Sequence, residues 1–295
     1  GILLGLQESN DRVSKEAVKK LINSLIKDDG NWRVNPTNVD CGLLSYAVLK
    51  NSKDYKKIKP AMDFSISLIE KNICKDGMVA YLADKSIDER YIDTLGFVCP
   101  FLQLYSNIYG DKKYSQISLE QINQYNKYGL LYDTYLPNHA YNPKNKLPLG
   151  VYGWGRGVAW YVIGLIDTYL EMKDSEEKLI LKQNIKNVAD SYINYQRQDG
   201  GFGSILQNER TYDSSVTAVL AYFYSQCYEI FGDEKYLNIS NKCLQKIKSA
   251  TRITGKVDWC QGDTKGIGVH SQTFDIMPFA QGFTLRAALI NLERE

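Results

Sequence analysis

The chain has 295 residues, of which 44% are hydrophobic, so it is long enough to bury a substantial core. Its formal net charge is +2, and basic and acidic residues are mixed along the sequence, which argues against a nucleic-acid-binding protein and against a disordered acidic tail. No apolar run approaches the length of a membrane span, so we expect no membrane partner.

The cysteines bear on metal binding and on the compartment. Six are scattered along the chain and none forms a CxxC pair, so no zinc site or other metal site is expected. Scattered cysteines in a chain of this length are typical of reduced, buried thiols, which favours a cytoplasmic protein. Residues 1–6 are apolar but lack the basic region and cleavage site of a signal peptide.

The sequence alternates two kinds of helical segment, which predicts an all-α fold. Segments that are apolar nearly all round are typical of buried inner helices. They cover residues 1–9, 39–51, 91–109, 155–172, 214–231 and 275–292. Amphipathic, lysine-rich segments are typical of outer helices, and they cover residues 14–28, 55–73, 112–127, 175–197 and 234–251.

Six inner helices with outer partners describe an (α/α)6 barrel, predicted here as one domain over residues 1–295. Five outer helices are found rather than six, because the chain begins inside the first inner helix. We therefore expect the first outer helix to be missing and the chain to be N-terminally short. A partner chain covering the exposed groove would make a homodimer.

Polar residues gather where the inner helices begin, and these starts share one end of the predicted barrel. Helix N-termini attract anions through their free N–H groups and the helix dipole. Asp40 and Asp93 open the second and third inner helices. Burial among apolar neighbours raises the pKa of a carboxyl such as Asp93, while the helix dipole opposes the rise. A helix-capping role is the alternative for both aspartates.

The segment from Gly150 to Trp160 carries four glycines, two tryptophans and one arginine. Such a glycine-rich helix opening is unfavourable by propensity and indicates a close approach of the backbone to a ligand. Trp154 and Trp160 offer flat apolar faces, and Arg156 offers a fork for a carboxylate, so together they suit a sugar ring that bears an acid. The alternative is a turn followed by a core tryptophan.

A hydroxyl-rich start precedes the fifth inner helix at Asp213, Ser214 and Ser215. Their side chains are candidates to meet substrate oxygens, and a helix cap is the alternative.

Residues 154–160 resemble the Trp-x-Arg-Gly-x-x-Trp signature of the unsaturated uronyl hydrolases. These are the unsaturated glucuronyl and rhamnogalacturonyl hydrolases of glycoside hydrolase families 88 and 105. Residues 93–101 resemble the Asp-x-Leu-x-x-x-x-Pro-Phe segment with the catalytic aspartate, and residues 213–218 the acidic-Ser-x-Thr-Ala segment. Residues 277–282 resemble the last helix start, which we expect to serve packing. The families often place a histidine after a segment like Gly129–Tyr132, where this chain has Asp133.

The resemblance implies the (α/α)6 barrel and hydration of a 4,5-unsaturated uronic acid at the non-reducing end of an oligosaccharide. It implies that Asp93 is the acid and base, while Asp40 stabilises the cation and keeps Asp93 protonated through like-charge repulsion. Arg156 would pair with the uronate, with Trp154 and Trp160 as the sugar platform. The partner is then an oligosaccharide, and neither a metal nor an organic cofactor is needed.

Other functions stay open at this point. A conventional inverting glycosidase also uses two carboxyls and occurs on such barrels. An epimerase of the N-acylglucosamine type needs histidine as acid and base, and neither His139 nor His270 lies at a predicted inner-helix start. A lanthionine-cyclase-like protein would need zinc ligands that have no matching spacing here. A catalytically impaired sugar-binding protein is the non-enzyme alternative.

Overall fold

The computed structural model describes residues 1–82 and 88–292. The inner helices are α1 (Ile2–Leu6), α3 (Cys41–Asn51), α5 (Asp93–Tyr109), α7 (Gly155–Glu171), α9 (Ser214–Phe231) and α11 (Pro278–Leu292). The outer helices are α2 (Arg12–Leu25), α4 (Tyr55–Lys71), α6 (Lys112–Tyr128), α8 (Glu176–Tyr192), followed by a 3-10 turn (Ile193–Tyr195), and α10 (Glu234–Ser249). Every predicted helix is confirmed, although the first is shorter than expected.

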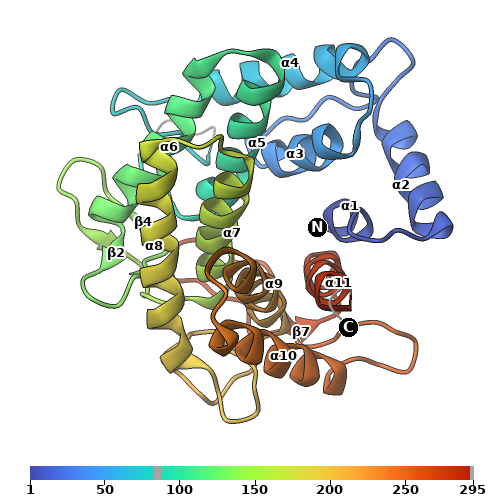
Figure 1. The fold of residues 1–295 in the computed structure, drawn as a ribbon. Helices are drawn as coiled ribbons and strands as arrows, with labels where there is room; N and C mark the ends of the chain where they lie inside the picture. The colour runs from blue at the N-terminus through green and yellow to red at the C-terminus, as the bar shows by residue number, and fades with distance from the viewer. Residues whose placement is uncertain (83–87, 293–295) are drawn as a thin grey trace.

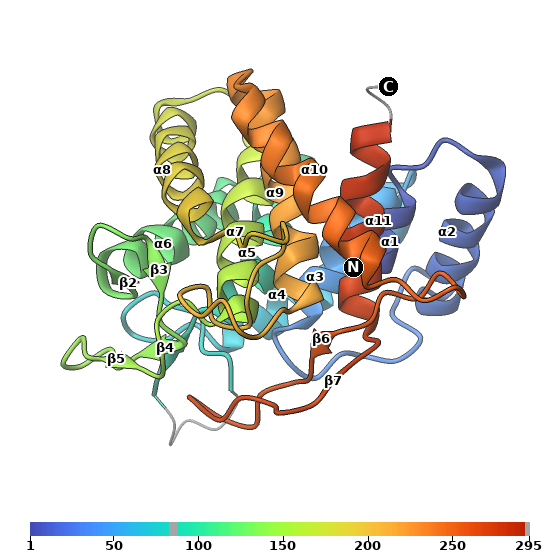
Figure 2. The same ribbon diagram turned by 90° about the horizontal axis from the view of Figure 1, so that it is seen from below.

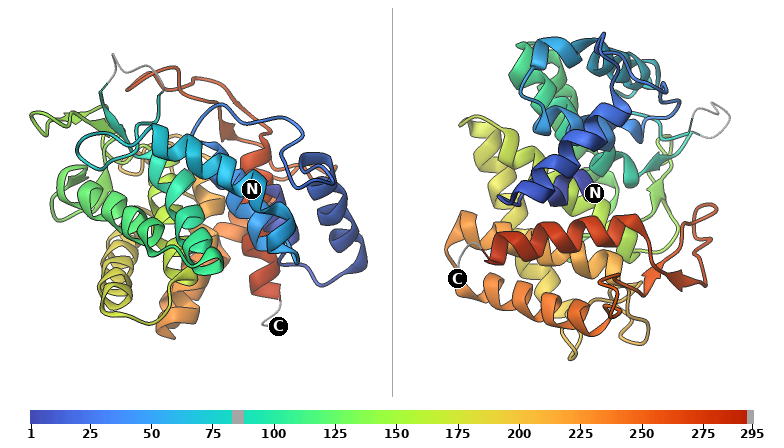
Figure 3. Two further views of the ribbon diagram at one scale, coloured as in Figure 1. Left: turned by 90° about the horizontal axis from the view of Figure 1, so that it is seen from above. Right: turned by 90° about the vertical axis from the view of Figure 1, so that its right-hand side faces the viewer.

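The inner helices follow one another around a ring (Figure 1). Each contacts the next in the order α1, α3, α5, α7, α9, α11, and α1 also contacts α11. The red C-terminal helix and the blue N-terminal helix lie side by side in both views of Figure 3. The outer helices α2, α4, α6, α8 and α10 lie around the outside, so the alternation of sequence segments is an alternation in space.

The acidic residues between the two helix kinds act as N-caps of the outer helices. The side chains of Asp54, Asp111 and Asp233 accept backbone N–H bonds at the starts of α4, α6 and α10. Such caps satisfy donors that have no partner inside the helix. Helices α4, α6, α8 and α10 each bury one stripe, as α10 does with Tyr236, Ser240, Cys243 and Ile247, whereas α2 has no fully buried residue.

The inner helices α5, α7 and α9 are buried nearly all round and pack closely. A Cβ atom added at Gly96 of α5 would lie 2.7 Å from Cε3 of Trp160 on α7, so only glycine fits there. No described helix is long and apolar enough to cross a bilayer. Five of the six free thiols are buried, and Cys74 is partly exposed.

Short strands that the sequence did not predict lie at one end of the ring (Figure 2). β1 (Arg90–Tyr91), β4 (Ala140–Tyr141) and β5 (Pro148–Leu149) form an antiparallel sheet in the order β1-β4-β5. β2 (Leu130–Leu131) pairs with β3 (Leu136–Pro137), and β6 (Cys260–Gln261) pairs with β7 (Phe274–Asp275). These strands belong to the connections that lead into inner helices, so they surround the end at which the candidate residues were expected.

A buried ion pair crosses the ring. Nη1 of Arg286 on α11 lies 2.7 Å from Oδ2 of Asp167 on α7, and their side chains are 2% and 0% exposed. The hydroxyl of Tyr222 on α9 donates to Oδ1 of Asp167 over 2.5 Å, and its ring lies 3.8 Å from the Arg286 guanidinium carbon. Three neighbouring inner helices are therefore joined by one charged cluster.

Asp167→Asn is expected to lower the free energy of unfolding by about 3 kcal/mol, because Arg286 loses its fully buried carboxylate partner and keeps only Glu8, 3.3 Å from its Nε atom. Urea denaturation followed by circular dichroism measures this change. Asp174→Asn is the control, since it alters a fully exposed partner of Lys178 and should leave the urea midpoint unchanged. Equal midpoints for both variants would contradict the role given to the buried pair.

Candidate active site

Asp93 is the first residue of α5, and its side chain does not cap the helix, whose N-cap is Ile92. The residue is 8% exposed, and its Oδ2 atom has no hydrogen-bond partner among the described residues. Burial raises the pKa of Asp93 to about 7, a nearby Asp263 adds to the rise, and its own backbone N–H and the charge of Arg156 oppose it. Near neutral pH this carboxyl is present in both protonation states, as a group that alternates between acid and base requires.

His139 lies against Asp93. Its Nε2 atom is 4.0 Å from Oδ2 of Asp93, and its Nδ1 atom accepts a hydrogen bond from the backbone N–H of Gly268 over 3.4 Å. A neutral imidazole that accepts at Nδ1 carries its proton at Nε2, facing the carboxyl. Burial, together with the charge of His270, lowers the pKa of His139 to about 4. The contact is therefore between a neutral ring and a carboxyl rather than an ion pair.

Aromatic rings form a wall beside this pair. The ring of Trp154 lies 4.4 Å from that of His139 and 5.2 Å from that of His270, measured between centroids. The Trp154 indole N–H donates to Oε1 of Gln261 over 3.3 Å. Both ring nitrogens of His270 are buried without a hydrogen-bond partner in the described part of the chain. A flat wall edged with unpaired polar atoms suits the apolar face and hydroxyls of a sugar.

Arg156 is buried and held by backbone and side-chain groups. Its Nε donates to the Ser215 hydroxyl over 3.0 Å, and its Nη2 donates to Sγ of Cys260 over 3.3 Å and to the carbonyl of Gln261. The carboxylate of Asp263 lies 3.6 Å from Nη1 and its side chain is 79% exposed, so this nitrogen faces the mouth of the site. The guanidinium is fixed on one side and available on the other.

Asp213 supports Arg156 through Ser215. The Asp213 carboxylate accepts the backbone N–H of Ser215 over 2.8 Å, which makes it the N-cap of α9, and it also accepts the Ser215 hydroxyl over 2.8 Å. Both side chains are closed to solvent. The capping alternative is thus confirmed for Asp213, while direct contact of Asp213 or Ser215 with a substrate stays a prediction.

The glycine-rich segment makes room for protein atoms. A Cβ atom added at Gly157 would lie 2.9 Å from the Trp154 ring and 3.1 Å from a methyl group of Ile92. Gly157 therefore lets Trp154 fold back over the start of its own helix. We expected these glycines to bring the backbone close to a ligand. At Gly157 the close neighbours are instead two protein side chains, those of Trp154, the N-cap of α7, and of Ile92, the residue before Asp93.

Trp160 is buried, with 7% of the residue exposed, and Trp154 is buried too, with 3% exposed. The Trp160 ring packs 4.4 Å from that of Phe97 and 4.8 Å from that of Phe279, and the Phe279 ring lies 4.9 Å from the guanidinium carbon of Arg156. Phe279 thus provides packing, as expected, and also supports Arg156. Direct contact of Trp160 with substrate stays a prediction.

The Tyr81 hydroxyl feels the charges of both predicted aspartates. Burial raises the pKa of this hydroxyl to about 12, and the charges of Asp93, Asp40 and Asp263 add to the rise. Asp40 is exposed and does not cap α3 with its side chain, and partial burial of its carboxyl raises its pKa. The carboxylate whose charge raises the pKa of Asp93 is Asp263. A catalytic role of Asp40 stays a prediction.

Several site residues were not found from the sequence: Tyr81, His139, Gln261, Asp263 and His270. They come from loops and two-residue strands rather than from helix starts. For the two histidines, the signal available in the sequence was their rarity, since the chain has only two. No comparable signal in the sequence pointed to the other three residues. Ser214 is at the expected place, with its buried hydroxyl unpaired among the described residues, and its backbone N–H bonds to the carbonyl of Trp259 over 2.9 Å. The described residues hold no group of three or more His, Cys, Asp or Glu side chains suited to a metal ion.

The sequence matches the model of Glycosyl Hydrolase Family 88 over residues 1–294. The chain belongs to glycosyl hydrolase family 88. The family assignment made from the Trp154–Trp160 segment is thereby confirmed. A search of curated proteins by sequence finds no match for this family 88 chain.

Solved structures share the fold of the family 88 chain. A possible member of family GH105 from Klebsiella pneumoniae matches with a TM-score of 0.86 and 16% identity, covering 99% of this chain and 81% of that one. A family 105 glycoside hydrolase from C. acetobutylicum has a TM-score of 0.82 and 16% identity, with coverage of 99% and 92%. The unsaturated glucuronyl hydrolase of Bacillus sp. GL1, described as responsible for the degradation of glycosaminoglycan, has a TM-score of 0.76 and 17% identity, with coverage of 99% and 84%.

Asp93→Asn is expected to stabilise this family 88 chain at pH 8 and to have little effect at pH 4. The pKa of Asp93 is near 7 in the folded state and 3.8 in the reference state, so its contribution to stability is full below pH 4 and is lost as the pH rises through 7. The asparagine variant has no charge to bury, and its gain at pH 8 should be roughly 2–4 kcal/mol. Urea denaturation at both pH values measures it, and a gain that does not grow with pH would contradict the burial of Asp93.

Proposed function

We propose that this chain is a glycosidase that removes a 4,5-unsaturated uronic acid from the non-reducing end of oligosaccharides produced by polysaccharide lyases. The observation that carries the proposal is Asp93, a buried carboxyl with a pKa near 7 whose Oδ2 atom is unpaired among the described residues and lies beside His139, which in turn packs against Trp154. The proposal includes the view that the helical ring is an (α/α)6 barrel. It is supported by family membership and by the fold shared with an unsaturated glucuronyl hydrolase.

The first step is protonation of the vinyl ether. The C4=C5 double bond supplies its π electrons to the proton of Asp93, a C4–H bond forms, and positive charge develops at C5 and the ring oxygen. Asp93 becomes a carboxylate, and its negative charge stabilises the positive charge nearby. Its pKa near 7 makes the proton available at neutral pH, since an acid with the usual aspartate pKa would already have lost it.

The second step is addition of water at C5. The Asp93 carboxylate takes one proton from the water while its oxygen bonds to C5, which restores the acid for the next cycle. The product is a hemiketal, which opens and releases the remaining sugar chain. The Nε2 atom of His139 lies 4.0 Å from the same carboxyl and its ring is neutral at pH 7, so it places no competing charge beside Asp93.

Substrate orientation is assigned to Arg156 and the aromatic wall. The Nη1 atom of Arg156 faces the mouth and would take the uronate carboxylate in place of the exposed Asp263. Trp154 would lie under the sugar ring. Stabilisation of the cation is assigned to Asp40 and the Tyr81 hydroxyl, whose pKa is raised by the charges of Asp93 and Asp40.

The purified protein is expected to reduce the ultraviolet absorbance of the conjugated double bond in lyase-generated unsaturated disaccharides. Asp93→Asn should lower kcat at least about 10³-fold, because it removes the only acid and base in the scheme. Asp174→Asn, an exposed residue beyond α7, serves as the matched control and should keep full activity. Turnover of saturated disaccharides with inversion would instead support a conventional glycosidase, and binding without turnover would support a sugar-binding protein.

Asp263→Asn is expected to move the alkaline limb of the kcat/KM pH profile to lower pH. The charge of Asp263 raises the pKa of Asp93, so its removal lets Asp93 lose its proton earlier as the pH rises. Arg156→Met should move the same limb to higher pH, because the charge of Arg156 lowers that pKa, and should also raise KM. Profiles measured on one unsaturated disaccharide test both shifts, and two shifts in the same direction would exclude Asp93 as the titrating acid.

A further inference from the structure

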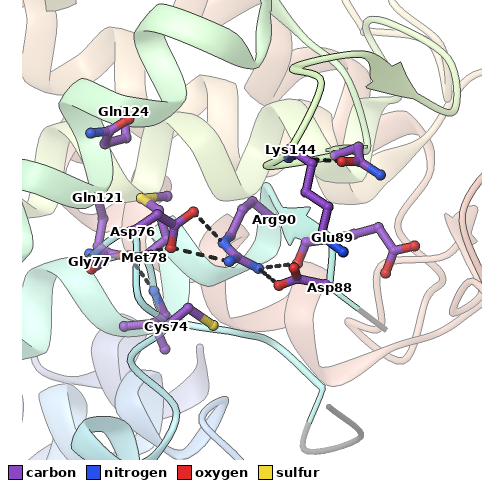
Figure 4. A network of polar contacts seen from close by, with 12 residues as sticks. Cys74, Asp76, Gly77, Met78, Asp88, Glu89, Arg90, Gln121, Gln124 and Lys144 are labelled. Atoms are coloured by element: carbon purple, nitrogen blue, oxygen red, sulfur yellow. Dashed lines mark hydrogen bonds and ion pairs between the residues drawn. The ribbon is translucent and has the colours of Figure 1, made fainter. Parts of the chain in front are cut away.

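Arg90 forms a clamp with Asp76 and Asp88 (Figure 4). Its Nε and Nη2 atoms contact the two carboxylate oxygens of Asp76 over 3.0 and 3.1 Å, and its Nη1 contacts Asp88 over 2.9 Å. The Arg90 side chain is 3% exposed, whereas Asp76 and Asp88 keep part of their surface in solvent. A paired fork of this geometry fixes the direction of the guanidinium as well as its position.

The clamped residue belongs to the short strand that leads into Asp93. Arg90 and Tyr91 form β1, Ile92 follows as the N-cap of α5, and Asp93 is the first helical residue. Opposite Arg90 and Tyr91, β4 contributes Tyr141 and Ala140. The backbone N–H of Ile92 donates to the carbonyl of His139 over 3.1 Å, so the strand pair continues up to the two facing site residues.

Asp93 and His139 come from segments far apart in the sequence and meet through this pairing. Two residues per strand provide few backbone bonds, and such a pair is weakly stable without further support. The Tyr91 ring packs edge-on 5.7 Å from His139, so any shift of β1 also moves this wall. The Arg90 clamp is the charged anchor on the segment between Asp88 and Asp93.

We propose that Arg90 is a positioning residue for the catalytic pair, because its clamp with Asp76 and Asp88 holds β1 and so sets the distance between Asp93 and His139. The inference rests on the proposed function, in which that pair carries the proton. The described hydrogen bonds of the Arg90 side chain go to Asp76, Asp88 and the Glu89 carbonyl, so its effect on the pair passes through the strand backbone.

Two Arg90 variants separate a positioning role from a general contribution to folding. Arg90→Met removes the clamp and keeps the apolar stem, and Arg90→Lys keeps the charge but loses the fork. The matched control is Arg252→Met, which removes another arginine–aspartate pair, with Asp258, from the exposed loop after α10. For each variant, kcat and KM on an unsaturated disaccharide are measured together with the thermal midpoint.

A histidine titration provides a readout that does not depend on activity. The chain has two histidines, so the imidazole region of a carbon–proton correlation spectrum holds two sets of signals, and a His270→Gln spectrum assigns them. The groups that face the pair are Arg156 and Asp263 toward Asp93, His270 and Tyr91 toward His139, and Tyr81 near the carboxyls. None of them is altered in the Arg90 variants.

Arg90→Met is expected to lower kcat about 10- to 100-fold with KM changed less than about threefold, because misplacement of reacting groups by about 1 Å costs this much. Its His139 signals should titrate at higher pH than in the wild type, since a loosened strand exposes the ring. Arg90→Lys should keep activity within about tenfold of the wild type. Arg252→Met should match the wild type in both readouts.

The inference is overturned if Arg90→Met leaves the His139 titration unchanged. This holds if kcat is retained, and it holds equally if kcat falls only in proportion to the loss of folded protein. If the wild type turns over no unsaturated substrate, the proposed function fails, while the His139 titration still decides whether Arg90 sets the geometry. If Arg90→Met does not fold, Asp88→Asn weakens the clamp at its more exposed partner, and the same titration shift is required of it.

Discussion

The buried pair between Arg286 and Asp167 is the constraint on which the ring of inner helices depends. A charge that is closed to solvent must keep its partner, so α11 and α7 can lie on either side of α9 only in the register that brings these two groups together. Tyr222 adds α9 to the same cluster. Asp93 and Trp154 stand at the beginnings of α5 and α7, and Ser215 stands in the first turn of α9, so the register of the helices also sets the spacing of the site.

The site itself gathers groups that folding alone disfavours. Asp93 is buried as a carboxyl, His270 keeps two unpaired ring nitrogens among the described residues, and Arg156 is enclosed with one nitrogen left toward the mouth. Each costs free energy in the absence of a ligand. The same burial holds His139 neutral and keeps Asp93 partly protonated near pH 7, so the environment that weakens the fold gives the carboxyl its proposed reactivity.

The helices could be read from the sequence because their physical causes are local. Asp111 and Asp233 cap the helices that follow them, and the apolar periodicity of each segment reports whether it is inner or outer. Asp93 and Arg156 were found because they stand at helix starts. His139 and Asp263 were not, because their loops are ordered by strands of two residues, too short to leave an alternating pattern. For Asp40 and Trp160 the sequence predicted the position near a helix start but not the contacts of the side chain, since those contacts depend on the neighbouring helices.

The distribution of thiols has a practical consequence. Sulfur reacts with alkylating reagents as the thiolate, and burial raises the pKa of Cys243 and Cys260 to about 12, while Cys74 is the one free thiol in the described chain that is not buried. Partial burial raises the pKa of Cys74 as well, so a folded molecule should gain one adduct slowly at Cys74 and the other five only when the ring opens. The mass of the intact protein after a timed exposure to the alkylating reagent would then report the fraction of molecules that had unfolded in that time.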